Sequence, residues 1–174
     1  MRFFGFLLYS FLKPWRTRFI LPAFFDKYIS MSRCFALRLQ GARIGKETVI
    51  REKVFIVFPR NLIIGDKSKI GTNTQIYNYS LVSIGNNCEL GPNLYVQTNE
   101  HVWKESNKPI REQGSVSKEV HIGNNVYSGY AVVVLNNGSV ADDTVLGACT
   151  LVNKKLESGF IYAGVPAKKI KPLY

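Results

Sequence analysis

The chain has few of the residues on which metal sites and disulfide frameworks depend. Its 174 residues include two histidines and three cysteines. The number of cysteines is odd and no C-x-x-C pair occurs, which argues against a disulfide framework or a structural zinc site. We therefore expect reduced thiols in a cytoplasmic protein that binds no metal. These residues are His101 and His121, and Cys34, Cys88 and Cys149.

Membrane-spanning and nucleic-acid-binding patterns are also missing. The apolar run over residues 3–12 is too short to span a bilayer, which takes about 20 residues. No small-residue cleavage site follows it, so we do not expect a cleaved signal peptide. The formal charge of +11 would suit nucleic acid, but no RNP-like, zinc-finger or helix-turn-helix pattern accompanies it. We place nucleic acid last among the partners.

An N-terminal arm over residues 1–40 stands apart by its composition. Seven basic residues and one acidic residue give it a charge of +6, and aromatic residues are dense throughout. Pro14 and Pro22 predict that it forms short helices. Such an arm suits contact with an anionic membrane face. It equally suits a cap on the rest of the fold or packing on a neighbouring subunit, and both interpretations stay open.

A period of six residues organises the chain beyond the arm. The period matches neither a helix nor a long strand, and it predicts short strands joined by tight turns. Three hexads would form a turn of about 18 residues, and successive turns would stack by parallel strand pairing. The sequence therefore predicts an all-β solenoid. Its clearest inward positions are Ile122, Ser128, Val134, Val140, Leu146 and Val152.

The same period begins at Ile44 and twice slips by two residues, at Ile64 and at Ile84. The frame breaks over residues 102–119, a loop long enough to indicate a function. Its Trp103 either stacks on a ligand or packs back on the coil. We predict three parts: the arm at 1–40, a β-helix at 41–157 with the loop at 102–119, and a tail at 158–174.

Several motifs resemble one family in their order and spacing. They are Ile84-Gly-Asn-Asn, Gly91-Pro-Asn, Thr98-Asn-Glu-His101, the loop, Ile122-Gly-Asn-Asn-Val-Tyr127 and Ala163-Gly-Val-Pro-Ala167. Together they resemble the hexapeptide-repeat O-acetyltransferases that include the maltose, galactoside and xenobiotic enzymes. The segment at 109–114 resembles the branch that acetylates bacterial surface polysaccharides. The resemblance implies a left-handed parallel β-helix assembled as a homotrimer, with active sites between subunits.

The resemblance also implies a reaction, in which acetyl-CoA donates its acetyl group to a hydroxyl of a sugar or glycan. His101 matches the family's catalytic base, and imidazole suits that role near neutral pH. A main-chain amide near Gly129 would stabilise the charge that develops on the thioester oxygen. The positions matched to cofactor binding are Gly129, Tyr130, Ala148, Asn153, Lys154, Lys168 and Lys171.

The sequence departs from the family pattern at Tyr127, where tryptophan is usual, and at Ser128, where an aliphatic residue is usual. An inward hydroxyl at Ser128 needs a hydrogen-bond partner. We predict a polysaccharide or glycolipid O-acetyltransferase that the arm brings to the inner membrane face. The alternatives are an acetyltransferase for a small soluble acceptor and a non-catalytic β-helix assembly module. The zinc carbonic anhydrases of the same fold need about three histidine ligands, which this chain lacks.

Overall fold

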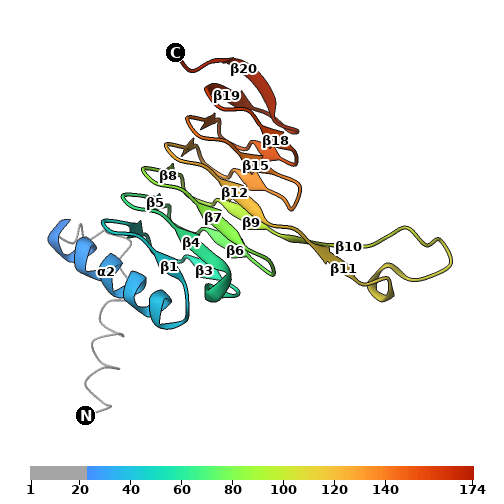
Figure 1. Cartoon of the computed structure of the whole chain (residues 1–174), viewed down its shortest axis with the longest axis horizontal. Helices are drawn as coiled ribbons and strands as arrows, with labels where there is room; N and C mark the ends of the chain where they lie inside the picture. The colour runs from blue at the N-terminus through green and yellow to red at the C-terminus, as the bar shows by residue number, and fades with distance from the viewer. Residues whose placement is uncertain (1–22) are drawn as a thin grey trace, which may run out of the picture.

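The structure is a computed structural model that describes residues 23–174. Within these residues, the helix α2 (Ala23–Leu39) packs against the first turn of a solenoid of about six turns (Figure 1). The rest of the predicted arm, residues 1–22, lies outside the described residues. Within residues 23–174, no helix is long and apolar enough to cross a membrane.

The solenoid has three parallel sheets. Each of the first five turns contributes one strand to each sheet, and the sixth contributes strands to two of them. Sheet A contains β1 (Arg43–Ile44), β4 (Leu62–Ile64), β7 (Val82–Ile84), β12 (Val120–Ile122), β15 (Ser139–Val140) and β18 (Lys155–Leu156). Sheet B contains β2 (Val49–Ile50), β5 (Lys69–Ile70), β8 (Glu89–Leu90), β13 (Tyr127–Ser128), β16 (Val145–Leu146) and β19 (Phe160–Ala163), followed by the antiparallel β20 (Lys168–Pro172). Sheet C contains β3 (Phe55–Ile56), β6 (Gln75–Tyr77), β9 (Tyr95–Gln97), β14 (Val133–Val134) and β17 (Leu151–Val152).

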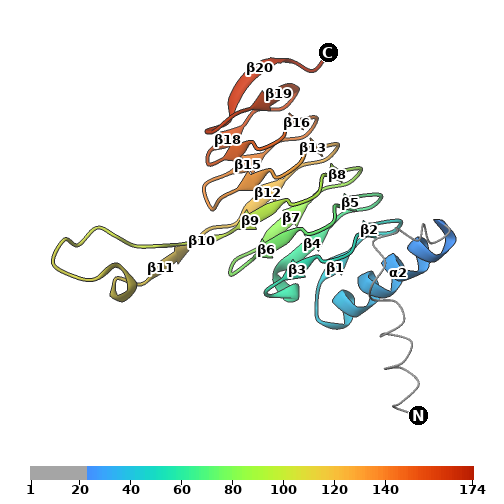
Figure 2. The same ribbon diagram turned by 180° about the vertical axis from the view of Figure 1, so that it is seen from behind.

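The all-β solenoid predicted from the hexads is confirmed, and it matches a left-handed β-helix. The chain passes from sheet A to sheet B to sheet C in each turn, so the prism has an A–B edge, a B–C edge and a C–A edge. Sheet B continues through β19, beyond residue 157 where the sequence placed the end of the helix. Figure 2 shows the same stack from behind.

The slips of two residues in the hexad frame have a simple cause. Strands β4, β7 and β12 have three residues, and because side chains alternate along a strand, the first and third both point inward. Ile44 therefore pairs with Ile64, 20 residues on, and Ile64 with Ile84. Ile122 pairs with Val140, and there the turn has the predicted 18 residues.

Stacked aliphatic side chains form the core along each sheet. Two-residue strands point their second residue inward, which produces the hexad pattern in the sequence. Sheet A contributes Ile64, Ile84, Ile122 and Val140; sheet B contributes Ile50, Ile70, Leu90 and Leu146; and sheet C contributes Ile76, Val96, Val134 and Val152, all of them buried. Cys88 is buried in the same core, where it packs as a small apolar side chain.

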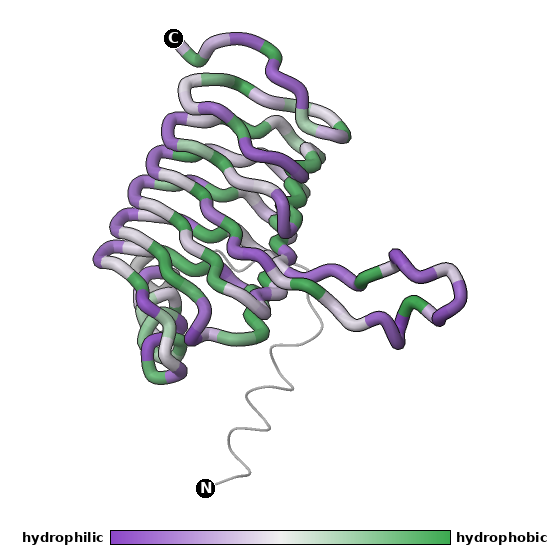
Figure 3. Tube along the Cα trace, turned by 45° about the vertical axis from the view of Figure 1, so that its right-hand side comes forward, coloured by the Kyte–Doolittle hydropathy of each residue, from purple (hydrophilic) through white to green (hydrophobic). Residues whose placement is uncertain are grey.

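A ladder of side-chain hydrogen bonds follows the A–B edge. The Asn86 side-chain oxygen accepts from the Asp66 backbone N–H at 2.7 Å, and the Asn124 oxygen accepts from the Asn86 N–H at 2.8 Å. Asp142 repeats the contact with Asn124 at 2.7 Å. Hydrophilic residues accordingly repeat along one edge of the stack in Figure 3. Backbone N–H groups at the corners lie outside the sheets, and these side-chain oxygens accept their hydrogen bonds.

Most corners contain one non-glycine residue in the left-handed conformation, and at Lys67 the φ angle is +54°. We expect Lys67→Gly to raise the free energy of unfolding by about 0.5 to 1 kcal/mol, because glycine has no Cβ to strain this conformation. Urea unfolding would measure it. Lys155→Gly, in the extended strand β18, is the control and should lower stability. A loss of stability in Lys67→Gly would contradict the prediction.

The predicted loop is an antiparallel ribbon that leaves the solenoid at the C–A edge. Strand β10 (Asn99–His101) pairs with β11 (Ser115–Ser117), and a short 3-10 helix, η2 (Ile110–Glu112), lies between them. The regular frame therefore ends before His101 and not after it. Figures 1 and 2 show the ribbon projecting away from the stack. Trp103 is 62% exposed, so it does not pack back on the coil of its own chain.

Candidate functional site

The B–C edge brings together three of the predicted cofactor residues. Gly129 and Tyr130 follow β13, and Ala148 occupies the corresponding corner one turn later. A Cβ added to Gly129 would lie 2.8 Å from the Ala148 backbone nitrogen, so the two turns are in direct contact. Gly129, Gly147 and Ala148 have little or no side chain, and we call this stretch of the edge the strip of small residues; Tyr130 and Ala148 are exposed beside it.

Strand β20 carries two further predicted residues, Lys168 and Lys171, at the C-terminal end of sheet B. Lys168 pairs with Ala163 and Lys171 with Ile161, so the tail folds back over the last strand of the sheet. Both lysines are exposed. Lys168 therefore lies at the same end of β19 as the B–C edge, beyond Ala148.

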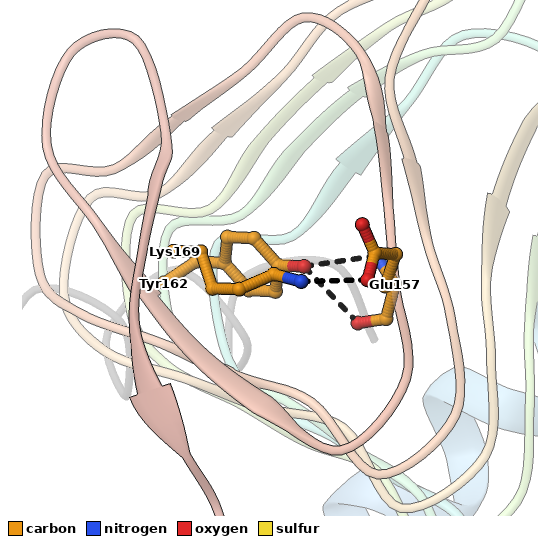
Figure 4. A network of polar contacts seen from close by, with 3 residues as sticks. All are labelled: Glu157, Tyr162 and Lys169. Carbon is orange, nitrogen blue, oxygen red and sulfur yellow. Dashed lines mark hydrogen bonds and ion pairs between the residues drawn. The ribbon is translucent and has the colours of Figure 1, made fainter.

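A small polar network holds β20 in this position (Figure 4). The Glu157 backbone N–H donates to the Tyr162 hydroxyl at 3.0 Å, and the Lys169 ammonium lies 2.6 Å from the Glu157 carboxylate. The same ammonium is 3.8 Å from the centre of the Phe160 ring. Lys169 is thus engaged with the solenoid, whereas its neighbours Lys168 and Lys171 remain available to a ligand.

The C–A edge holds the other predicted residues, His101, Asn153 and Lys154. His101 lies in β10 at the base of the ribbon, opposite Ser115, and is exposed. Asn153 and Lys154 follow β17 and are exposed as well. The full width of sheet C separates this edge from Gly129. Within one chain, the structure therefore does not bring the predicted base and the predicted thioester position together.

A cavity of about 910 Å³ lies between α2 and the outer face of sheet B. Ile29, Ser30 and Arg33 of α2 line one end, and Gly129 and Tyr130 line the other. The volume lies in the range of small-molecule sites. This groove extends from the N-terminal helix to the B–C edge. The sequence does not predict it, because residues such as Ile29 and Gly129 are 100 positions apart in the chain.

Charged and aromatic side chains line the groove between its two ends. Lys69 of β5 and Glu89 of β8 form an ion pair at 2.6 Å, and Tyr127 of β13 is the register neighbour of Glu89. The Tyr127 ring is half-exposed. Sequence analysis did not single out Lys69 or Glu89. Their spacing of 20 residues, one full turn, was the only available signal.

The inward hydroxyl of Ser128 has the partner that the sequence required. Ser128 is buried at 1% exposure, and its hydroxyl oxygen accepts from the Gly91 N–H at 3.1 Å. That N–H also donates to the Ser128 carbonyl at 3.0 Å. The departure from an aliphatic residue is therefore accommodated without leaving a buried hydroxyl unsatisfied.

The second histidine lies on the outer face of sheet A, remote from the groove. The His121 Nδ1 is 2.7 Å from the Ser83 hydroxyl, and its Nε2 is 3.3 Å from the Glu119 carboxylate. This is a serine–histidine–carboxylate cluster, but it is half-exposed and the groove does not extend to it. His121 points outward because it lies between the inward Val120 and Ile122 of β12.

Two further residues, Cys88 and Asn78, are too buried to act as a nucleophile or to bind an acceptor. Burial raises the pKa of the Cys88 thiol above its usual value, so it remains protonated and is a poor nucleophile. Asn78, which lies in the turn before that of His101, is fully buried. Its side chain accepts from the Phe58 N–H at 3.0 Å and donates to the Phe58 carbonyl at 2.7 Å. Asn78 is therefore a structural residue.

No family model matches the chain, but several known proteins are similar to it. Over 157 residues it is 29% identical to "Putative colanic acid biosynthesis acetyltransferase WcaF" of Escherichia coli. The aligned region covers 90% of this chain and 84% of that protein. It is 28% identical over 133 residues to the galactoside O-acetyltransferase of Escherichia coli, covering 76% of this chain and 64% of the relative.

Solved structures share the fold. A hexapeptide-repeat-containing acetyltransferase of Vibrio cholerae O1 biovar eltor, crystallised in complex with acetyl coenzyme A, superposes with a TM-score of 0.75. The two chains are 19% identical, and the match covers 83% of this chain and 78% of the other. At that identity the match shows the architecture alone.

Proposed function

We propose that this chain is an acetyltransferase of the hexapeptide-repeat type, and that it transfers an acetyl group from acetyl-CoA to a hydroxyl of a sugar in a surface polysaccharide or lipid-linked glycan. One observation carries the proposal. The groove over sheet B ends at Gly129 and Tyr130, where the strip of small residues along the B–C edge begins. An acceptor in the groove and a thioester on the strip would meet at Gly129.

The strip suits the extended pantetheine arm of acetyl-CoA. Tyr130 and Ala148 would offer main-chain groups to its amides, since their corners are exposed. At the C-terminal end of the strip, Lys168 and Lys171 would bind the phosphates of the nucleotide, where ammonium groups act as point charges. Acetyl-CoA is a substrate here, and it would bind with its acetyl group at Gly129 and its nucleotide near Lys168 and Lys171.

The catalytic base must come from a second copy of the chain. His101 lies on the C–A edge and Gly129 on the B–C edge, so packing the two edges of neighbouring copies together would complete the site. The ribbon that carries His101 exposes Trp103, Ile110 and Val116, and apolar side chains gathered on a projecting ribbon favour contact with another protein surface. A closed ring of three chains makes this head-to-tail contact three times, and each chain uses its B–C edge and its C–A edge once. Asn153 and Lys154 would then contact the cofactor of the neighbouring chain.

The reaction proceeds by direct attack. The neutral His101 imidazole takes the proton of the acceptor hydroxyl as its oxygen attacks the thioester carbonyl. The carbonyl oxygen becomes negative in the tetrahedral intermediate, and the backbone N–H near Gly129 stabilises it. The intermediate then expels the CoA thiolate, which receives the proton from the imidazolium. The products are an acetyl ester and CoA, with no acyl-enzyme.

The sugar acceptor is supported from two directions. The sequence relatives are named for colanic acid biosynthesis and for galactoside O-acetylation. In this chain the half-exposed Tyr127 ring provides a flat aromatic surface, and the Lys69–Glu89 pair provides hydrogen-bonding groups beside it. Aromatic and charged groups in one shallow groove suit a sugar, whose ring faces are apolar and whose edges are polar. We place the enzyme at the inner face of the cell membrane, where lipid-linked glycan is assembled.

Acetyl-CoA titration by calorimetry tests the cofactor half of the proposal. We expect one acetyl-CoA per chain, and we expect Lys168→Ala/Lys171→Ala to weaken its affinity about five- to tenfold because two cation–phosphate contacts are lost. The matched control is Lys46→Ala/Lys67→Ala on the A–B edge, which should bind like the wild type. CoA release with free sugars and with cell-envelope glycan then identifies the acceptor class. If the wild type does not bind acetyl-CoA, the proposal that the protein is an acetyltransferase is wrong.

A further inference from the structure

The outer face of α2 carries a continuous apolar stripe. Tyr28, Met31, Phe35 and Leu39 are spaced three, four and four residues apart, which places them on one side of a helix. They are 53%, 55%, 60% and 73% exposed. Exposure of single apolar residues is ordinary, whereas four large ones on one helical face mark an interaction surface.

The opposite face of α2 accounts for the packing against the solenoid. Ser30 and Cys34 are buried, and Leu37 packs on the core. The Ser30 hydroxyl accepts from the Ile50 N–H at 2.9 Å, and the Arg33 guanidinium donates to the Ile50 carbonyl at 3.1 Å. The helix therefore caps the first turn with one face, as one of the two sequence-based interpretations required.

The charge of the described residues is concentrated at the same end. Residues 23–60 contain eight basic and three acidic residues, so their formal charge is +5, whereas residues 61–174 contribute +2. Within the described part, Lys27, Arg43, Lys46 and Lys53 are all exposed in α2 and in the first turn. An apolar stripe surrounded by a positive surface is complementary to one kind of partner, a bilayer with anionic lipids.

We propose that the stripe formed by Tyr28, Met31, Phe35 and Leu39 docks α2 on an anionic membrane, with the apolar side chains among the lipids and the surrounding basic residues at the headgroups. A second protein could also cover the apolar stripe, but it would leave the charge of +5 on residues 23–60 unexplained. Long-range attraction brings the molecule to the surface, and burial of the stripe holds it there.

Docking through α2 also sets the orientation of the groove. Ile29, Ser30 and Arg33 of α2 line its N-terminal end, whereas Gly129 and Tyr130 lie farther along the stack. The groove therefore opens beside the membrane and leads away from it toward the B–C edge. This consequence rests on the proposed function: the acceptor would be a glycan attached to a membrane lipid, which enters from the membrane side, while acetyl-CoA enters from the cytoplasmic side.

Co-sedimentation of the full chain with vesicles tests the docking. The vesicles contain phosphatidylcholine with about one third phosphatidylglycerol, and pure phosphatidylcholine vesicles serve as the comparison. We expect Met31→Gln/Phe35→Gln to weaken binding to the anionic vesicles at least tenfold, because two apolar side chains lose their burial. Binding of the wild type should also fall as salt is raised from about 50 to 500 mM.

The matched control is Val165→Gln/Ile170→Gln, which changes two exposed apolar residues at the opposite end of the solenoid. It should bind vesicles like the wild type. Equal binding by Met31→Gln/Phe35→Gln, with an unchanged far-ultraviolet spectrum, would overturn the proposal, and a change in its oligomeric state would then assign the stripe to a second copy. Acetyl-CoA affinity, measured on the same variants, should stay unchanged, so failure of the docking is distinguishable from failure of the proposed function.

Discussion

His101→Ala is expected to lower kcat for acetyl transfer by about 10²- to 10⁴-fold, because the acceptor hydroxyl loses the group that takes its proton. Acetyl-CoA affinity should stay within about twofold of the wild type, since the imidazole acts in the transition state and not in ground-state binding. Steady-state CoA release and calorimetry on the same protein measure the two quantities. Loss of binding together with turnover would mean that His101 supports the cofactor site instead.

His121→Ala is the matched control, because it removes the other histidine of the chain. Its contacts to Ser83 and Glu119 lie on the outer face of sheet A, and no part of the groove reaches them. We expect kcat to remain within about twofold of the wild type. A loss comparable to that of His101→Ala would move the reaction to the serine–histidine–carboxylate cluster.

A mixing experiment separates catalysis between copies from catalysis within one chain. His101→Ala has an intact strip of small residues, and a second variant, Ala148→Trp, has an intact His101 but a blocked strip. If the site lies between two copies, unfolding and refolding the two inactive variants together should restore part of the activity. No restoration, in mixtures shown to exchange subunits, would contradict a shared site.

Gly85→Ala is expected to lower the free energy of unfolding by about 3 kcal/mol, a large effect for one methyl group. Its Cβ would lie 2.6 Å from the backbone carbon and oxygen of Gly123 in the next turn. Neither backbone can move without breaking the parallel pairing of β7 with β12. Urea unfolding followed by circular dichroism would measure the loss.

Gly114→Ala provides the control for this steric argument. Gly114 has a φ of +82°, and a Cβ there would meet nothing within 4 Å. The substitution should therefore cost only the strain of the left-handed conformation, about 1 kcal/mol, and that strain is confined to the ribbon. Equal losses in the two variants would mean that contact between stacked turns is not the cause.

Side chains that repeat at a fixed interval could be predicted because they depend on local geometry. The hexads placed the inward residues of each strand correctly, since a two-residue strand and a tight corner impose the same alternation in every turn. The outward direction of His121 followed from its place before the inward Ile122. The slips at Ile64 and Ile84 were visible too, although only the three-residue strands explain them.

Relations between turns and between edges depended on the tertiary structure. The groove joins α2 to Tyr130 because the first turn stacks three turns below β13, a distance in sequence that no local pattern spans. Lys69 and Glu89 became neighbours through parallel pairing of β5 with β8. The position of His101 relative to Gly129 likewise depends on which edge of the prism each corner occupies.

The sequence by itself determined the solenoid, the place of the inserted segment and the candidate base, because each of them depends on a repeat or a short motif in the sequence. Only the tertiary structure decided that α2 covers the first turn and leaves an apolar stripe outside, and that the inserted segment is a ribbon projecting at the C–A edge. The physical reason is that local spacing dictates which side chains point inward, whereas stacking dictates which edges and faces remain for a ligand, a membrane or a second copy.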